Sequence, residues 1–132
     1  LNKHNVAGRI VFEIVEDEEL KSAERVSVFV ERAKSMGAMI AIDDFGSGYS
    51  NFSYIIKIKP DYVKIDGSII KDIDINKDSY AIASAIVAFA KDLGIKTIAE
   101  YVHSKEIFNV CKEIGIDEFQ GFYLGIPSKK AF

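Results

Sequence analysis

The sequence lacks residues on which several classes of protein depend. It has one cysteine, Cys111, so an intrachain disulfide is impossible and a reducing compartment is expected. Cys111 falls on the apolar face of an expected helix, which favours a buried structural thiol over a nucleophile. There is no signal peptide and no apolar run of membrane-spanning length. We therefore expect a cytoplasmic location for this segment, while a parent protein could carry a membrane anchor elsewhere.

An excess of charge of one sign is also missing. The chain has 17 basic and 20 acidic side chains, spread along its length, for a net charge of −3. Because no basic patch or run is present, binding to a nucleic-acid polymer is not expected. The absence of a Cys/His cluster argues against a zinc site. Gly46-Ser47-Gly48 does not match a phosphate-binding fingerprint, and Ser47 has no nearby histidine in the sequence for a serine triad.

What the chain does have is a regular alternation of expected strands and helices. Its 132 residues, 48% of them hydrophobic, are enough for one core and one domain. Apolar and β-branched segments predict strands over residues 9–16, 39–44, 61–66, 95–100 and 117–120. Helical spacing predicts helices over residues 17–37, 51–57, 79–93 and 104–114, and polar connections are expected at 1–8 and 72–78. This alternation predicts parallel βα units.

Two adjacent carboxylates, Asp43 and Asp44, end the most apolar of the expected strands. The carboxyl ends of parallel strands are where α/β folds place their chemistry. Neighbouring carboxylates repel each other unless a cation lies between them, so a divalent metal is one interpretation. The alternative is that one Asp caps the following helix and the other is solvated.

Every expected strand ends in a polar group, so one edge of the sheet should collect them all. They are Glu13, Glu16, Asp43, Asp44, Lys64, Asp66, Glu100 and Gln120. Lys64 lies in an otherwise apolar strand and shares a face with Asp66. It is either a paired core lysine or a cation that orients water or stabilises a phosphate. Oxygen ligands of this kind favour Mg²⁺ or Mn²⁺, and carboxylates with one lysine suit two-metal phosphodiester hydrolysis.

Five segments of the chain resemble the EAL domain, the bacterial cyclic di-GMP phosphodiesterase. They are Phe12-Glu13-Ile14-Val15-Glu16, Asp43-Asp44-Phe45-Gly46-Ser47-Gly48-Tyr49-Ser50, Val63-Lys64-Ile65-Asp66, Ala99-Glu100-Tyr101-Val102 and Gln120-Gly121-Phe122-Tyr123-Leu124-Gly125. The likeness runs in order from about residue 9 to residue 128. It implies an α/β fold of the (β/α)8 TIM-barrel type, of which this chain supplies about five βα units. Residues 1–132 would then be the C-terminal part of a single EAL domain.

The resemblance also implies roles for individual residues. Two Mg²⁺ or Mn²⁺ ions would be bound by Glu13, Asp43, Asp44 and Glu100, and one phosphodiester of cyclic di-GMP would be cleaved to give linear pGpG. Lys64 looks like the catalytic lysine beside the nucleophilic water, with Glu100 also catalytic. Gln120 and Asp66 look like substrate contacts. Glu16 and Ser47 look like residues that stabilise the loop after Asp44.

Two departures from the family limit what this stretch should do alone. His103 stands where the family usually has a second glutamate, and it is either a ligand or a residue at a helix start. The upstream Glu-Ala-Leu segment and an upstream asparagine ligand are absent, so weak or no activity is expected of this stretch by itself. A degenerate EAL module that binds cyclic di-GMP or a protein partner without turnover is the alternative. A response-regulator-like domain fits less well, because its acidic pair should follow the first strand.

A partial barrel also carries a physical liability. Five strands of an eight-stranded barrel leave two unpaired edges and one uncovered apolar sheet face. We therefore expect the chain to form a homo-oligomer or to belong to a larger protein, with sensor or GGDEF domains upstream.

Overall fold

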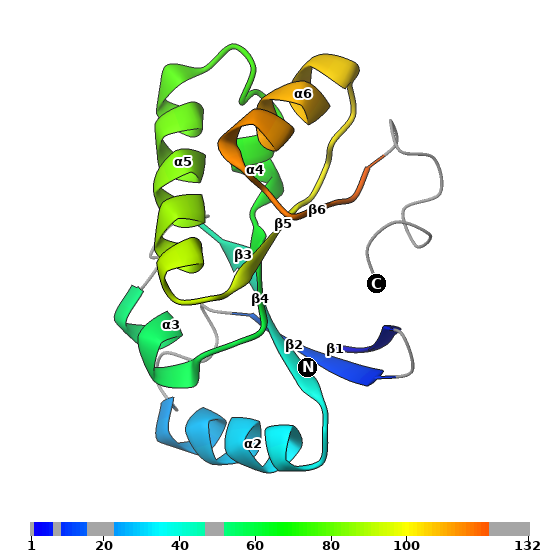
Figure 1. Cartoon of the computed structure of the whole chain (residues 1–132), viewed down its shortest axis with the longest axis vertical. Coiled ribbons are helices and arrows are strands. Elements are labelled where there is room, and N and C mark those ends of the chain that lie inside the picture. The colour runs from blue at the N-terminus through cyan, green and yellow to red at the C-terminus, as the bar shows by residue number, and fades with distance from the viewer. Residues whose placement is uncertain (1, 7–8, 16–22, 47–51, 122–132) are drawn as a thin grey trace.

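One sheet organises the part of the chain that the structure, a computed structural model, describes: residues 2–6, 9–15, 23–46 and 52–121 (Figure 1). Within these residues six strands follow one another in the order β1 to β6. The strands are β1 (Asn2–Val6), β2 (Arg9–Val15), β3 (Met39–Phe45), β4 (Tyr62–Ile65), β5 (Lys96–Ala99) and β6 (Glu118–Phe119). The helices are α2 (Ala23–Ser35), α3 (Phe52–Ile58), α4 (Gly67–Ile70), α5 (Lys77–Asp92) and α6 (Lys105–Ile114).

Strands β2 to β6 are all parallel to their neighbours, which confirms the predicted α/β class with five parallel strands. The expectation of a connector at residues 1–8 is wrong, because Asn2–Val6 forms a strand antiparallel to β2. This segment is polar and has no apolar alternation, so its sequence gives no strand signal, and the strand forms by backbone pairing with β2. The edge of β2 expected to be unpaired is therefore covered.

Within the described residues the helices follow the predicted pattern except near residue 70, and the predicted start of the first helix, residues 17–22, lies outside them. A single turn, α4, was not predicted, and α5 begins at Lys77, inside the segment expected to be a polar connection. Asn76 caps α5 with its side-chain oxygen, 2.9 Å from the Asp78 nitrogen and 3.2 Å from the Ser79 nitrogen. At the other end of the sequence, Gly115 closes α6 in the left-handed conformation that the glycine predicts.

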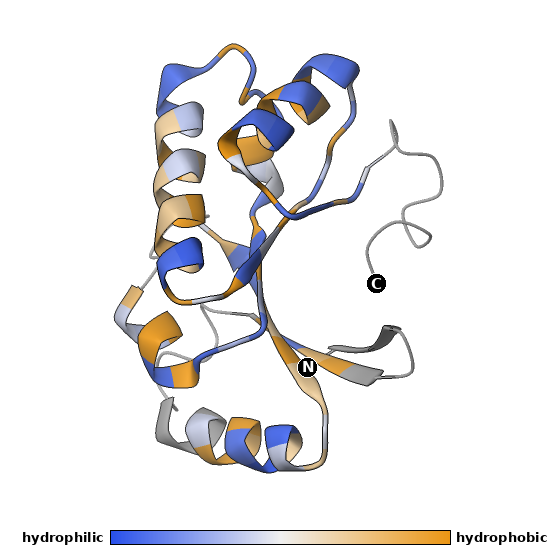
Figure 2. Cartoon of the chain, viewed as in Figure 1, coloured by the Kyte–Doolittle hydropathy of each residue, from blue (hydrophilic) through white to orange (hydrophobic). Residues whose placement is uncertain are grey.

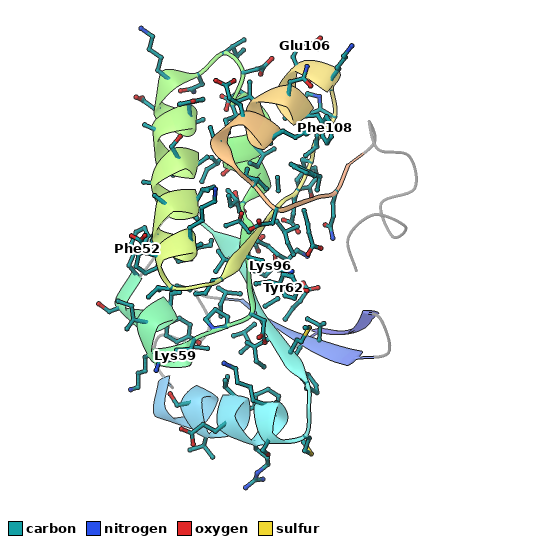
Figure 3. All side chains as sticks on the ribbon, viewed as in Figure 1. Phe52, Lys59, Tyr62, Lys96, Glu106 and Phe108 are labelled. Carbon is teal, nitrogen blue, oxygen red and sulfur yellow. The ribbon has the colours of Figure 1, made fainter. Side chains whose placement is uncertain are left out.

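Helices α2, α3 and α5 follow one another along one side of the sheet (Figure 1). Hydrophobic residues are concentrated along β3 and on α3, whereas both ends of α5 are hydrophilic (Figure 2). Three phenylalanines tie β3, α3 and α5 together. Phe52, labelled in Figure 3, lies on α3. Its ring forms T-shaped pairs with Phe45, at a centroid distance of 5.3 Å, and with Phe89, at 4.6 Å. Cys111 is completely buried, and burial raises the pKa of its thiol to about 12, as expected of a structural thiol.

A second, smaller apolar cluster lies on the other face of the sheet. It consists of Val11, Ala41, Tyr62 and Ile98, which are 0–6% exposed. The expectation of an uncovered apolar face is therefore wrong for these residues. None of the described helices is long and apolar enough to cross a membrane.

The edge of the sheet where the parallel strands begin is held by two aspartates. The backbone nitrogen of Ile40 donates to the Asp61 carboxylate at 2.8 Å, and that of Thr97 donates to the Asp117 carboxylate at 2.9 Å. Each aspartate directly precedes one strand and binds the backbone of the strand before it. These bonds fix neighbouring strands relative to each other at the edge opposite the candidate site.

Candidate functional site

The candidate site is built on the face of the sheet that carries the small apolar cluster. In a strand, residues two apart point to the same face. Each of four site residues lies two positions beyond a member of that cluster. Glu13 follows Val11, Asp43 follows Ala41, Lys64 follows Tyr62 and Glu100 follows Ile98. The apolar cluster is therefore a packed floor, and the four charged groups stand above it at the carboxyl edge.

Three carboxylates come together at this edge. Asp43, Asp44 and Glu100 each offer an oxygen, and these oxygens lie within 4.8 Å of one another. A regular strand would send Asp43 and Asp44 to opposite faces. A β-bulge prevents this: Ile42 pairs with Val63 and Phe45 with Ile65, so both aspartates face the single position between those partners.

Asp44 adopts the backbone conformation that the bulge requires. Its φ is +53°, in the left-handed region that costs most L-residues energy and that aspartate tolerates better than most. Its backbone nitrogen donates to the Asp43 carboxylate at 2.9 Å. Residues in such conformations collect at functional sites, where the surrounding structure holds them. Here the strain has an evident effect, because it brings the second carboxylate to the site.

Lys64 connects the two sides of the site. Its Nζ lies 3.2 Å from Glu13 Oε1 and 3.1 Å from Glu100 Oε1. Lys64 is 5% exposed and Glu13 is 3% exposed, so these ion pairs are shielded from water. Lys64 is therefore a paired core lysine, and this pairing places its charge beside the clustered carboxylates.

The electrostatics of the site favour additional positive charge. Burial raises the pKa of Asp43, Lys64 opposes that shift and Glu13 adds to it. Burial also raises the pKa of Asp44, with Asp43 and Asp66 adding to the effect. The pKa of Glu100 is raised by burial against the opposing charge of Lys64. Three carboxyl groups that are all harder to ionise than usual mark a place where a cation would be stabilised.

Lys64 itself is held in its charged form. Burial alone would lower the pKa of the ammonium group. The carboxylates of Glu100, Glu13 and Asp43 outweigh it, and the net pKa is raised. At neutral pH this side chain is therefore a fixed positive charge and a hydrogen-bond donor, not a base.

Asp66 and Gln120 lie at the same edge as the cluster, and Asp66 is close enough to Asp44 to raise the pKa of that carboxyl. Asp66 caps α4, and its carboxylate accepts hydrogen bonds from the Ser68 nitrogen at 3.0 Å and from the Ser68 hydroxyl. Gln120 directly follows β6, at the same edge, and its backbone nitrogen donates to the Ala99 carbonyl at 2.8 Å. Glu16 and Ser47 lie outside the described residues, so their predicted roles stay predictions.

The segment after Glu100 contains a feature that the sequence reasoning missed. Tyr101 has a φ of +61° and is 62% exposed, so a large side chain occupies a conformation that favours glycine. His103 contacts the backbone at the C-terminal end of α4. Its Nε2 is hydrogen-bonded to the Lys71 carbonyl at 3.1 Å, and Ser104 caps α6. The open question over His103 is therefore answered in favour of a contact near the start of α6, and the described metal-type cluster does not include it.

An apolar cavity of about 300 Å³ lies elsewhere, between α3 and the C-terminal end of α5. It is lined by Ile55, Ile56, Lys59, Pro60, Leu93 and Ile95, and contains none of the candidate residues. Its residues precede β4 and β5, so it is at the edge opposite the charged cluster. The cavity is therefore separate from the charged cluster.

Comparison with protein families identifies the arrangement. The family model described as the EAL domain matches residues 1–127. The chain belongs to the EAL domain family. It is 35% identical over 122 residues to the cyclic di-GMP phosphodiesterase PdeB of Shewanella oneidensis, an alignment that covers 92% of this chain and 14% of that protein. The chain thus spans about a seventh of the length of this EAL relative.

Solved EAL structures have the same fold. The PaMucR phosphodiesterase in complex with c-di-GMP superposes with a TM-score of 0.82 at 35% identity, covering 89% of this chain and 47% of that one. BlrP1 of Klebsiella pneumoniae, a complex with manganese and cyclic di-GMP, superposes with a TM-score of 0.80 at 34% identity, covering 85% and 29%. Another BlrP1 complex holds calcium in place of manganese. The predicted TIM-barrel-like EAL fold is confirmed, and the chain corresponds to part of it.

Proposed function

We propose that residues 1–132 are the C-terminal part of a single EAL domain that hydrolyses cyclic di-GMP to linear pGpG with divalent cations. The observation that carries this proposal is the gathering of Asp43, Asp44 and Glu100 within 4.8 Å beside a buried lysine. The family match and relatives that bind this dinucleotide with manganese or calcium support it. Relatives such as the bifunctional MucR support a parent protein with further domains, for example of GGDEF type.

The donor set fits a hard divalent cation. Asp43, Asp44 and Glu100 would hold it, with Glu13 completing the set for a second ion. All four side chains offer carboxylate oxygens, which Mg²⁺ and Mn²⁺ prefer. Burial and mutual repulsion raise the pKa of Asp43, Asp44 and Glu100, and a bound cation would relieve both effects. When bound, such ions activate water for attack and neutralise charge on the phosphate.

The chain's own residues supply the rest of the chemistry. Lys64 is charged, buried and fixed by two carboxylates, so it can donate a hydrogen bond without moving. This position suits it to orient the attacking water or to stabilise negative charge that develops on the phosphoryl oxygens. Glu13 and Glu100 hold the ammonium group in place, which makes them positioning residues for Lys64 as well as candidate ligands. Gln120 and Asp66, at the same edge, are proposed substrate contacts.

The proposal is tested by measuring cation binding and turnover together. Purified protein is titrated with Mn²⁺ while its Tm is followed, and cyclic di-GMP is then added and pGpG is quantified by chromatography. In the complete protein, wild type should gain Tm with Mn²⁺ and form pGpG, whereas residues 1–132 alone should form little or none. Asp43→Asn should lose most of the Mn²⁺-induced gain and lower turnover by more than about 100-fold.

Matched controls separate the possible outcomes. Asp74→Asn removes a carboxylate from an exposed position and should behave as wild type. Binding of cyclic di-GMP without any pGpG, in the complete protein, would support the alternative of a degenerate EAL module. Failure of wild type to bind either Mn²⁺ or the dinucleotide would overturn the proposal. Gel filtration of the same samples tests the expected homo-oligomer.

A further inference from the structure

Tyr101 has properties that a structural role alone does not explain. It follows Glu100 directly and is 62% exposed, whereas most aromatic side chains of the described residues are packed. Its φ of +61° lies in the left-handed region, where a bulky residue is an outlier and glycine would be unstrained. A side chain that is both exposed and strained contributes little to burial. Such a residue is expected where it contacts something outside the fold.

The ring of Tyr101 is held across the candidate site's edge. It lies against Gly67, so that a Cβ added at Gly67 would be only 2.0 Å from Tyr101 Cδ2. Gly67 directly follows Asp66 at the end of β4, while Tyr101 follows Glu100 at the end of β5. The ring therefore lies across the carboxyl ends of two neighbouring strands, β4 and β5. One part of it rests on the backbone at Gly67 and the rest faces solvent.

We propose that Tyr101 is a stacking residue that binds a guanine base of the dinucleotide beside the carboxylate cluster. This inference rests on the proposed function. An aromatic ring supported on one side and open on the other is a platform on which a purine can stack. The phosphate would lie by Lys64 and the carboxylates, and the base would extend over the ring. Tyr101 would thus contribute to affinity and KM, and not to the chemical step.

The absence of tryptophan from the sequence permits a direct test. Tyr101→Trp introduces a single fluorophore at the platform, and Met36→Trp introduces one at an exposed position after α2, at the opposite edge of the sheet. Both variants of the 132-residue chain are titrated with cyclic di-GMP in Ca²⁺, the ion that accompanies it in a BlrP1 complex. Stacking should quench the fluorescence of Tyr101→Trp and leave that of Met36→Trp unchanged.

Affinity variants separate stacking from support of the fold. Tyr101→Phe keeps the ring and should retain affinity, whereas Tyr101→Gly should weaken binding about tenfold or more. Because glycine accepts the left-handed conformation, Tyr101→Gly should also keep or raise Tm. A merely structural role predicts instead that Tm falls together with affinity.

The outcomes distinguish this inference from the proposed function. If equilibrium dialysis shows normal cyclic di-GMP binding by Tyr101→Gly, or by Tyr101→Trp without quenching, the stacking role is overturned and the proposed function stands. If cyclic di-GMP binds neither to wild type and Met36→Trp nor to the complete protein that contains this chain, the proposed function is overturned and the stacking role with it. Quenching in Tyr101→Trp together with weakened binding by a stable Tyr101→Gly would establish the role.

Discussion

Replacing Lys64 with methionine removes one positive charge from the centre of the site with little change in shape. The two ion pairs, 3.2 Å to Glu13 and 3.1 Å to Glu100, are lost together. The carboxylates remain, and Glu13 is almost completely buried. Without a cation, the folded chain must hold a buried carboxylate that has no compensating charge, next to Asp43. Lys64→Met should therefore destabilise the metal-free protein strongly.

The size of the effect follows from burial. Removing one partner of a buried ion pair costs about 3–5 kcal/mol, whereas an exposed pair is worth about 0–1 kcal/mol. For 132 residues, such a loss lowers Tm by about 10–18 °C. The loss should be largest at neutral to alkaline pH. At lower pH it should shrink, because burial has already raised the pKa of Glu100, and protonation of that carboxyl removes part of the uncompensated charge.

The assay is urea and thermal unfolding followed by circular dichroism, with chelator and then with Mn²⁺. Lys96→Met, at the exposed first residue of β5, is the matched control and should cost no more than about 0.5 kcal/mol. Mn²⁺ should restore much of the stability of Lys64→Met, because the ion supplies the missing positive charge. If Lys64→Met is as mild as Lys96→Met, the buried ion pairs do not exist in solution, and the electrostatic reasoning about the site is wrong.

Three further predictions concern the bulge, the carboxylates and the platform. Asp44→Gly should stabilise the metal-free protein by about 1 kcal/mol, because glycine adopts a φ of +53° without strain. The same substitution should reduce the Mn²⁺-induced rise in Tm. Unchanged Mn²⁺ binding would exclude Asp44 as a ligand. Lowering the pH from neutral towards the ordinary titration range of aspartate should raise Tm in chelator. The folded pKa of Asp43 is raised above its unfolded value, so the folded state binds more protons in this window, and Asp43→Asn should lose part of this gain. Gly67→Ala should lower the free energy of unfolding by about 1–3 kcal/mol, because the added Cβ meets the ring of Tyr101. Adding Tyr101→Gly should restore the lost stability. A cost that the second substitution leaves unchanged would show that the two residues do not touch.

Much of the fold could be predicted because strands β2 to β6 carry strong local signals. Each is a short run of apolar, β-branched residues, and glycines such as Gly37, Gly94 and Gly115 mark the return to the next strand. The segment Asn2–Val6 has no such signal, since its strand forms by pairing with β2. The single turn of α4 was missed for a related reason. A turn this short is set by the Asp66 cap and its surroundings and not by helical periodicity.

The candidate site was predicted as a set of residues but not as an arrangement. The positions of Glu13, Asp43, Lys64 and Glu100 near the ends of expected strands identify them as candidates. The alternation of side chains along a strand then predicts the face of the sheet on which each lies. Alternation also predicts the wrong face for Asp44. The bulge that brings Asp44 to the correct face depends on the pairing register between β3 and β4, and no local sequence pattern predicts that register. The ion pairs of Lys64 join residues 51 and 36 positions apart, so they too depend on the assembled sheet.

The fully buried Cys111 allows local unfolding around α6 to be measured through the reactivity of its thiol. As the sequence has no other sulfhydryl, a colourless thiol reagent that releases dye on reaction has a single target. With a pKa of about 12, that target is almost entirely in its unreactive form while α6 stays in place. The rate of dye release therefore measures how often α6 separates from the sheet by local unfolding. If Mn²⁺ or cyclic di-GMP slows dye release, ligand binding at the distant carboxylates stabilises the domain as far as α6.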